Sequence, residues 1–384
     1  MANAQTGNPD SLIITEIRSN VTDPNIAIET YKHNIFYNPT ATDYKTLLVH
    51  LPGSFDAPLN TQLFPSYAAN WGFHAIGLRY KNSVAAKSAC EDSEDPNCFA
   101  NYRKEIIEGV DVSDKVDVDS DNSIENRLLK LIIHLHSENP NDGWGEFIAN
   151  GELAWGKIII SGHSQGGGHA AYIGLSKPLK RILMFASPND YSKHFDAPAS
   201  WPSTTPTADI SGYYAFGSLN DDIVPFDNQY QIWKSMGMNA KQDSTVVEGN
   251  VAPFKSSQMM YTTYSKSGTS VNHNATIRDE DTPLDENGKP VFENVWGTML
   301  GIYNTSSVKS NSRISIPIYP NPANTEISIP IKWDKASLHS ISGAKLLNWN
   351  TYSSSVSVAT LPAGIYFLTV YIADKTAVVK VIME

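Results

Sequence analysis

Runs of apolar residues, many of them β-branched or aromatic, recur between residues 46 and 218 of the chain. Continuous apolar runs of this kind are typical of parallel strands that are buried on both faces of a sheet. We therefore predict strands at 46–52, 73–80, 156–162, 181–187 and 212–218.

A helical pattern lies between two of these runs, at residues 122–136. Its apolar side chains recur at helical spacing on one face, and they are Ile124, Leu128, Leu131, Ile132 and Leu135. Ser123 immediately before them is a good N-cap residue. Strands that alternate with helices predict an α/β fold with a mostly parallel, doubly wound sheet.

The pattern changes near residue 303. Residues 303–312 are polar and rich in Ser and Asn, which is typical of a linker. From residue 313 to residue 384, short alternating segments punctuated by turns predict a small all-β sandwich. We therefore expect an α/β domain over residues 1–302, a linker over 303–312 and a β-sandwich domain over 313–384.

The C-terminal segment contains several motifs in a defined order: "YPNPANTEISI", "LHSISGAKL", "LPAGIYFLTV" and "AVVKVIM". In these motifs, residues 313–384 resemble the C-terminal sorting domain of the type IX secretion system. The resemblance implies export through the outer membrane, release or surface attachment, and the type IX machinery as a partner. The alternative is an ordinary β-sandwich binding module.

The chain of 384 residues has a formal charge of −11. Nucleic-acid backbones require clustered Lys and Arg, and the sequence has no such cluster, so nucleic acid is excluded as a partner. No stretch reaches the roughly 18 continuous apolar residues of a membrane-spanning helix. The first residues lack the basic and apolar regions of a signal peptide. We expect either a cytosolic protein or, as the sorting-domain resemblance favours, a secreted or cell-surface protein whose leader is absent from this chain.

Two cysteines, Cys90 and Cys98, flank a short polar loop. We expect them to form a disulfide if the chain is exported, and to remain reduced in a cytosol. A zinc site is not expected, because no second Cys or His pair follows at ligand spacing. The sequence implies no metal and no cofactor.

The segment "IIISGHSQGGGHAA" contains Gly-x-Ser-x-Gly between a predicted strand and a helical pattern. A nucleophile on a sharp strand-to-helix turn needs neighbours without bulky side chains, and Gly162 and Gly166 supply them on either side of Ser164. The turn also places Ser164 near a helix N-terminus, which favours an oxyanion. We predict that Ser164 is a catalytic nucleophile; the alternative is a glycine-rich turn.

A serine hydroxyl needs a base, and in α/β hydrolases the acid and then the histidine follow the serine in the chain. Four histidines follow Ser164. His169 lies in the helix after the turn, His194 precedes the best acid, and His339 belongs to the C-terminal domain. His273, in a polar loop, remains as the predicted base; a surface histidine without a role is the alternative.

The triad acid is best placed in "YYAFGSLNDDIVPF", where two aspartates follow a predicted strand. Asp221 is the first choice and Asp222 the second. Asp190, after the preceding strand, is a further alternative. For the oxyanion hole we predict the backbone N–H of Gln165 and, from the loop after residue 52, that of Ser54 with Phe55 next; the alternative for this loop is a simple turn.

Residues 30–302 resemble the α/β-hydrolase superfamily. "GHSQGG" is similar to the nucleophile turn of many lipases and cutinases, and "GSLNDDIVP" resembles the acid loop of dienelactone-hydrolase-like esterases, including polyester hydrolases. In that loop the Asp four residues before the Pro is catalytic, which implies Asp221 here. Two features depart from the polyester-hydrolase pattern. One is the segment 80–121, and the other is His163, which precedes Ser164 where those enzymes commonly have Trp.

The sequence therefore predicts a secreted serine esterase, similar to lipases, cutinases and polyester hydrolases. Ser164, His273 and Asp221 would form the triad, with an acyl-enzyme intermediate. Phe55 and Trp144 are our candidates for substrate contacts among the aromatic residues. The alternatives are a peptidase or acyltransferase with the same triad, and a non-catalytic surface-binding protein on a hydrolase scaffold.

Overall fold

The computed structural model describes residues 6–238, 243–303, 316–340, 345–372 and 375–384. The chain divides into two compact units, Ala2–Asn304 and Thr305–Glu384. Apart from Tyr303, the predicted linker at 303–312 lies outside the described residues. Among the described residues, no helix is both long enough and apolar enough to cross a membrane.

The large unit is built on one mixed sheet of nine strands, counted over its described residues. β1 pairs with β2, and β2 with β4, in antiparallel fashion. All further neighbours pair in parallel. In sheet order the strands are β1 (Ile13–Ile17), β2 (His33–Tyr37), β4 (His74–Gly77), β3 (Leu47–Leu51), β7 (Ile158–His163), β8 (Arg181–Phe185), β11 (Tyr213–Ser218), β13 (Met259–Thr262) and β12 (Thr245–Val246).

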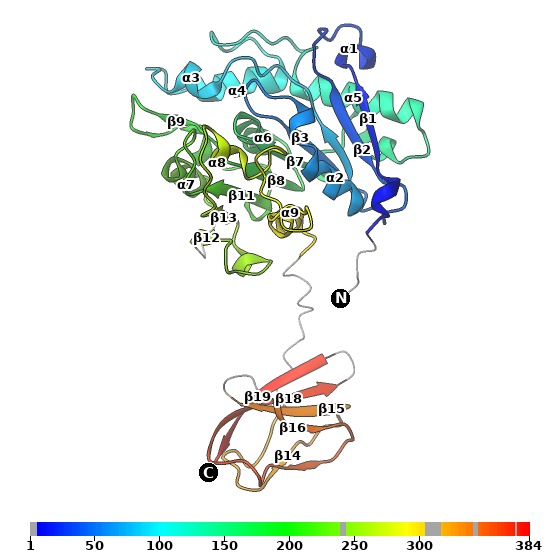
Figure 1. Cartoon of the computed structure of the whole chain (residues 1–384), viewed down its shortest axis with the longest axis vertical. Coiled ribbons are helices and arrows are strands. Elements are labelled where there is room, and N and C mark those ends of the chain that lie inside the picture. The colour runs from blue at the N-terminus through cyan, green and yellow to red at the C-terminus, as the bar shows by residue number, and fades with distance from the viewer. Residues whose placement is uncertain (1–5, 239–242, 304–315, 341–344, 373–374) are drawn as a thin grey trace. The chain divides into compact units, whose positions relative to one another are not determined.

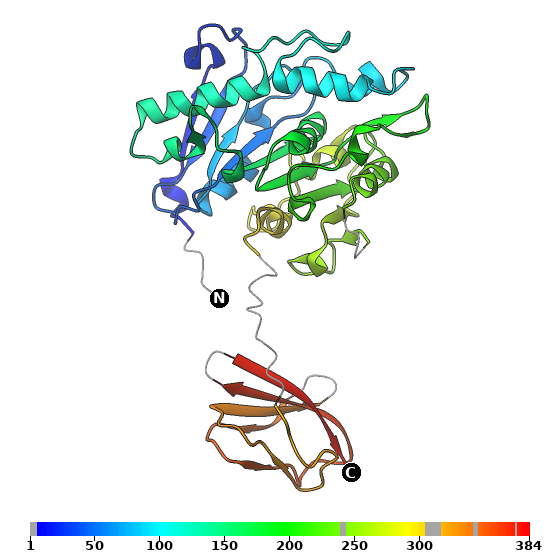
Figure 2. The same cartoon turned by 180° about the vertical axis from the view of Figure 1, so that it is seen from behind.

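Helices lie on both faces of this sheet, as Figure 1 and the reverse view in Figure 2 show. The large unit is therefore an α/β structure, as the alternating pattern predicts. The helices are α1 (Ser19–Thr22), α2 (Leu63–Asn70), α3 (Ala86–Cys90), α4 (Cys98–Glu108), α5 (Ile124–Glu138), α6 (Gln165–Ser176), α7 (Phe226–Ser235), α8 (Val271–Asn274) and α9 (Glu293–Leu300). Two short hairpins lie outside the sheet, β5 (Ile148–Ala149) with β6 (Glu152–Leu153) and β9 (Tyr191–Ser192) with β10 (Ala197–Pro198).

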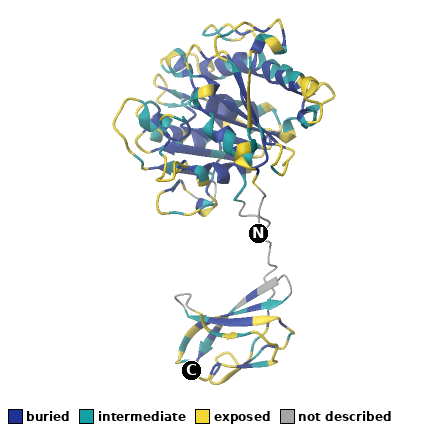
Figure 3. Ribbon diagram, turned by 45° about the vertical axis from the view of Figure 1, so that its right-hand side comes forward, coloured by how far each residue is buried: buried dark blue, intermediate teal, exposed yellow. Residues whose placement is uncertain are grey.

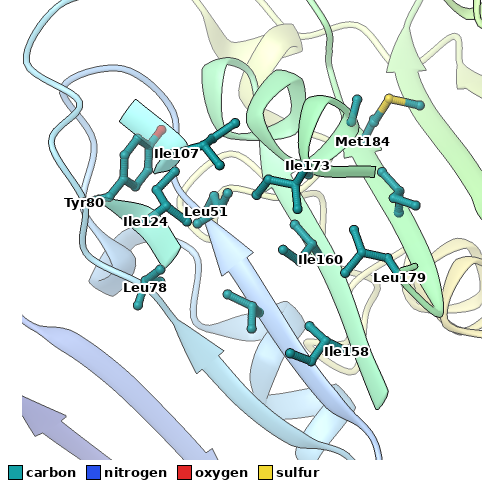
Figure 4. Packing of buried hydrophobic residues seen from close by; sticks show 14 of the residues in the cluster. Leu51, Leu78, Tyr80, Ile107, Ile124, Ile158, Ile160, Ile173, Leu179 and Met184 are labelled. Atoms are coloured by element: carbon teal, nitrogen blue, oxygen red, sulfur yellow. The ribbon is translucent and has the colours of Figure 1, made fainter. Parts of the chain in front are cut away.

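Alternate residues of the central strands enter different cores, because successive side chains of a strand point to opposite faces. In β7, Ile158 and Ile160 join the core beneath α4, α5 and α6, whereas Ile159 joins the core beneath α2 and α9. Figure 4 shows Ile158 and Ile160 of β7 in one cluster with Leu51 of β3 and Ile173 of α6. Burial on both faces explains the continuous apolar runs, and Figure 3 shows the central strands as buried.

The helix predicted at 122–136 is α5. It begins after Ser123, whose hydroxyl accepts the backbone N–H of Asn126 at 3.1 Å, so the predicted N-cap is confirmed. The predicted disulfide is also confirmed: Cys90 at the end of α3 is bonded to Cys98 at the start of α4. The bond joins these two helices, which both lie within residues 80–121.

The C-terminal unit consists of two small antiparallel sheets that share one core. The larger sheet has the order β16 (Lys345–Trp349), β15 (Lys335–Ser340), β18 (Gly364–Ile372) and β19 (Lys375–Met383), and the smaller pairs β14 (Glu326–Ser328) with β17 (Ser355–Ser357). Ile327 and Val356 of the smaller sheet pack in the same cluster as Leu338 and Leu368 of the larger one. This unit is the β-sandwich that the alternating segments predict.

Candidate active site

Ser164 occupies the sharp turn between β7 and α6. Its backbone angles are φ 51° and ψ −118°, a region that residues other than glycine rarely adopt. The backbone N–H of Ser164 donates to the carbonyl oxygen of Phe185 in β8 at 2.9 Å, which helps to hold the turn. Such strain persists only where the surroundings fix it, and it is common at functional sites.

The two glycines around Ser164 are required by close backbone approach. A methyl group on Gly162 would overlap the backbone of Gly166, and one on Gly166 would overlap the carbonyl oxygen of Leu51. The chain can therefore turn back on β3 and β7 only with glycine at both positions. This is the mechanical reason for the Gly-x-Ser-x-Gly spacing.

His273 lies in α8, and its Nδ1 is 2.8 Å from Oδ2 of Asp221 in the loop after β11. Both side chains are buried, with 5% and 0% of their surface exposed. The second oxygen of Asp221 accepts the backbone N–H groups of Ile223 at 2.9 Å and Val224 at 2.8 Å. The amide of Gln229 donates to Oδ2 at 3.0 Å. Hydrogen bonds thus hold both oxygens of the carboxylate that contacts the imidazole.

Ser164 and His273 line the same cavity. The hydrogen bonds among the described residues do not include one between the Ser164 hydroxyl and His273. In ligand-free structures such catalytic hydrogen bonds are often long and shorten when substrate binds.

The other two acid candidates do not contact His273. Asp222 is exposed, and its Oδ2 accepts the backbone N–H of Ser270 at 2.9 Å. Asp190 is fully buried, forms an ion pair with Arg103 of α4 and accepts the indole N–H of Trp201 at 2.7 Å. Asp190 therefore neutralises a buried guanidinium, and it is not the partner of the imidazole.

The loop after β3 lies against the turn that carries Ser164. The hydroxyl of Ser54 donates to Oε1 of Gln165 at 2.7 Å. The backbone N–H of Phe55, the next candidate for the oxyanion hole, donates to the carbonyl oxygen of Asn82 at 2.9 Å. Among the hydrogen bonds of the described residues, none uses the backbone N–H of Ser54 or of Gln165. These two amides are open donors beside Ser164.

Two side chains that position this region, Asn82 and Arg103, are not predicted from the sequence. The amide of buried Asn82 donates to the carbonyl oxygens of Gly53 at 2.6 Å and Asp56 at 2.9 Å, which shapes the loop after β3. The guanidinium of Arg103 donates to the carbonyl oxygen of Gln165 at 3.1 Å. A carboxylate that is buried after a strand, such as Asp190, needs a cationic partner. The positions of the residues along the sequence do not identify Arg103 as that partner.

Two more histidines lie near Ser164. His163 is buried with its ring 4.7 Å from the ring of His273, and its Nε2 is 3.4 Å from the carbonyl oxygen of His273. Burial, assisted by the neighbouring His273, lowers the pKa of His163 well below its usual value, so this ring is neutral. Burial lowers the pKa of His169 in the same way, and His169 packs against the rings of Tyr80 and Tyr102.

A cavity of about 660 Å³ opens over Ser164. The loop after β3, α3, the turn at Ser164 and the segment around α8 enclose it. Its charged and ionisable lining residues are Asp56, Lys87, Arg103, His163, His273, Arg278, Glu280 and Asp281. The described residues contain no group of three or more His, Cys, Asp or Glu side chains placed to hold a metal ion.

The two aromatic candidates for substrate contacts lie in different surroundings. Phe55 lines the cavity and 70% of its surface is exposed. Trp144 does not line it: only 2% of Trp144 is exposed, and its ring packs edge-on against His74 at 4.7 Å. The prediction for Trp144 is wrong because its indole belongs to the core beneath α5.

Residues 317–384 match the family model of the secretion system C-terminal sorting domain. A comparison of the chain with curated proteins gives no match. The family match falls on the β-sandwich unit and confirms the resemblance in the ordered C-terminal motifs. The chain therefore carries a type IX sorting domain that interacts with the type IX secretion machinery, and the protein is secreted or displayed at the cell surface.

Proposed function

We propose that the large unit is an α/β-hydrolase domain and that it cleaves carboxylic esters as a serine hydrolase, similar to lipases, cutinases and polyester hydrolases. Ser164 is the nucleophile, His273 the base and Asp221 the residue that orients the base. The observation that carries this proposal is the buried hydrogen bond between His273 and Asp221 beside a strained Ser164 in one cavity.

The arrangement of the three residues in chain and sheet supports the proposal. They follow one another as Ser, Asp and His, which is the order of α/β hydrolases. Ser164 follows a buried parallel strand and precedes a helix, which is the context that the Gly-x-Ser-x-Gly motif requires. Asp221 follows β11 at the carboxyl edge of the sheet, where active sites of parallel sheets gather.

In the proposed mechanism, His273 Nε2 takes the proton of the Ser164 hydroxyl as its oxygen attacks the ester carbonyl. The imidazolium then gives that proton to the leaving alcohol, and an acyl-enzyme remains. Water, activated by the same imidazole, cleaves the acyl-enzyme and releases the carboxylic acid. Asp221 stays ionised throughout and stabilises the imidazolium.

The backbone N–H groups of Gln165 and Ser54 stabilise the oxyanion of each tetrahedral intermediate in this mechanism. Both amides are open in the described hydrogen-bond network and lie at the turn and in the loop after β3, the two places from which α/β hydrolases supply these donors. The N–H of Phe55 is already used by Asn82.

A fluorophosphonate probe tests the proposal, because it phosphonylates activated serines. The exported protein should be labelled at Ser164, as peptide mapping would show, and should hydrolyse short para-nitrophenyl esters. A folded protein that neither reacts with the probe nor hydrolyses any ester would overturn the proposal and favour a binding protein. Faster cleavage of amide than of ester substrates would point to a peptidase instead.

A further inference from the structure

Most charged groups that line the cavity lie beside a group of opposite charge. The guanidinium of Arg278 lies 3.5 Å from Asp56, 3.6 Å from Glu280 and 3.9 Å from Asp281, so the three lining carboxylates gather around one cation. The guanidinium of Arg103 is paired with buried Asp190. The remaining lining cation of the Lys and Arg type is Lys87.

Lys87 extends from α3 and is half-buried. Its ammonium donates to the carbonyl oxygen of Ile223, another lining residue, at 2.9 Å. Among the described residues, no carboxylate lies within 4.0 Å of this nitrogen. Within the described part of the chain, no carboxylate therefore neutralises this ammonium, and two of its three N–H donors are open to other acceptors.

The helix that carries Lys87 is held in place from both ends. The backbone N–H of Ala86 donates to Oε1 of Gln165 at 3.0 Å, which ties the start of α3 to the residue next to the nucleophile. The disulfide of Cys90 ties its end to α4. A cation on a wall fixed in this way is preorganised for an anionic group of a bound substrate.

We propose that Lys87 selects esters that carry a second, ionised carboxyl group. This inference rests on the proposed function, since it assigns the substrate class of the same site. A neutral ester offers this ammonium at most a carbonyl oxygen. A carboxylate adds the attraction between two opposite charges to the hydrogen bond. Arg278 compensates only one of the three carboxylate charges around it, so that group stays negative and the ionised carboxyl group of a substrate is favoured at Lys87 instead.

Matched pairs of esters test the inference. On the acyl side, mono-para-nitrophenyl glutarate is compared with the same ester capped as its methyl ester. On the alcohol side, the butyrate ester of para-hydroxybenzoate is compared with that of methyl para-hydroxybenzoate. The pair that shows the larger preference tells on which side of the scissile bond the carboxylate binds.

In the wild-type protein, kcat/KM for the carboxylate ester of one pair should exceed that for its neutral partner by about tenfold or more. In Lys87→Met this ratio should fall to about one, chiefly through KM, and Lys87→Arg should retain most of it. Lys81→Met is the matched control, because the ammonium of Lys81 also donates to a backbone carbonyl, that of Asp117, but does not line this cavity.

Two results would overturn the inference alone: hydrolysis of the neutral esters without any preference for a carboxylate, or a preference that survives in Lys87→Met. A folded protein that hydrolyses none of these esters would overturn the proposed function, and the inference with it.

Discussion

The Nδ1 atom of His273 lies 2.8 Å from Oδ2 of Asp221, and the backbone N–H groups of Ile223 and Val224 hold the other oxygen of the same carboxylate. Because the carboxylate accepts the Nδ1–H, the neutral imidazole keeps its lone pair on Nε2. The pair therefore sets the tautomer that a general base at this position requires.

Asp221→Asn should lower kcat for ester hydrolysis by about 10⁴-fold, because an amide can donate to Nδ1 and favour the wrong tautomer. The measurement is steady-state hydrolysis of a short para-nitrophenyl ester. Asp222→Asn is the control and should stay close to wild type, since Asp222 contacts the backbone of Ser270 rather than His273. Equal losses in the two variants would contradict the assignment of Asp221.

Gly166→Ala should lower kcat/KM by about 10²-fold or more, because the added methyl group would overlap the carbonyl oxygen of Leu51 and displace Ser164, the proposed nucleophile. Gly156→Ala is the matched control: the nearest atom to its methyl group is the carbonyl oxygen of Pro178 at 3.9 Å. Kinetics of both variants, with their thermal unfolding, test the prediction. Wild-type kinetics in Gly166→Ala would show that the turn tolerates a side chain.

Replacing both cysteines by alanine should destabilise the protein by about 2–3 kcal/mol, because the bond between Cys90 and Cys98 closes a short loop in the unfolded chain. Because α3 forms a wall of the cavity, kcat/KM should fall as well. Urea unfolding and ester hydrolysis measure the two effects, and reduction of the wild type by a thiol should reproduce both. A variant with unchanged stability would contradict this role of the bond.

Acid should destabilise the large unit in part through His33. Burial, with the positive charges of Arg127 and Arg79, lowers the pKa of His33 to about 3, and its Nδ1 accepts the backbone N–H of Arg79 at 3.0 Å. Below the unfolded pKa of about 6.5 the unfolded chain binds a proton that the native state does not, so stability is lost as the pH falls from about 6.5 towards 3, by up to about 1.4 kcal/mol per pH unit.

His33→Asn keeps an acceptor for Arg79 but cannot bind that proton. Urea unfolding at a series of pH values should therefore give a smaller acid loss for His33→Asn than for the wild type. The difference in unfolding free energy between the two proteins should shift steadily in favour of the variant as the pH is lowered. A difference that is the same at every pH would contradict the role of His33.

The central fold was predictable because its strands are buried on both faces. The run 156–162 corresponds to β7, and the run 212–218 to β11. Continuous apolar runs of this length are typical of strands that are buried on both faces of a sheet. The edge strand β1 was not predicted: four of its five residues, Ile13–Ile17, are exposed, and it shows no alternation of buried and exposed positions. Its position depends on pairing with β2, a tertiary contact that no local pattern encodes.

In the candidate site, too, local features were predictable from the sequence and tertiary contacts were not. The motif around Ser164 is local, so strand, turn and glycines could be predicted together, whereas the meeting of His273 with Asp221 spans 52 residues and could only be suggested by chain order. Composition offered no means to tell the buried core role of Trp144 from a substrate contact. Lys87 and Asn82 lie in residues 80–121, and the placement of this segment beside the cavity depends on tertiary packing.

The most direct test of the proposed function is the hydrolysis of para-nitrophenyl butyrate by the wild-type protein and by Ser164→Ala. The wild type should hydrolyse the ester, and Ser164→Ala should lower kcat by at least about 10⁴-fold, with an unchanged circular dichroism spectrum and melting temperature. A folded Ser164→Ala protein that hydrolyses the ester as fast as the wild type would contradict the assignment of Ser164 as the nucleophile.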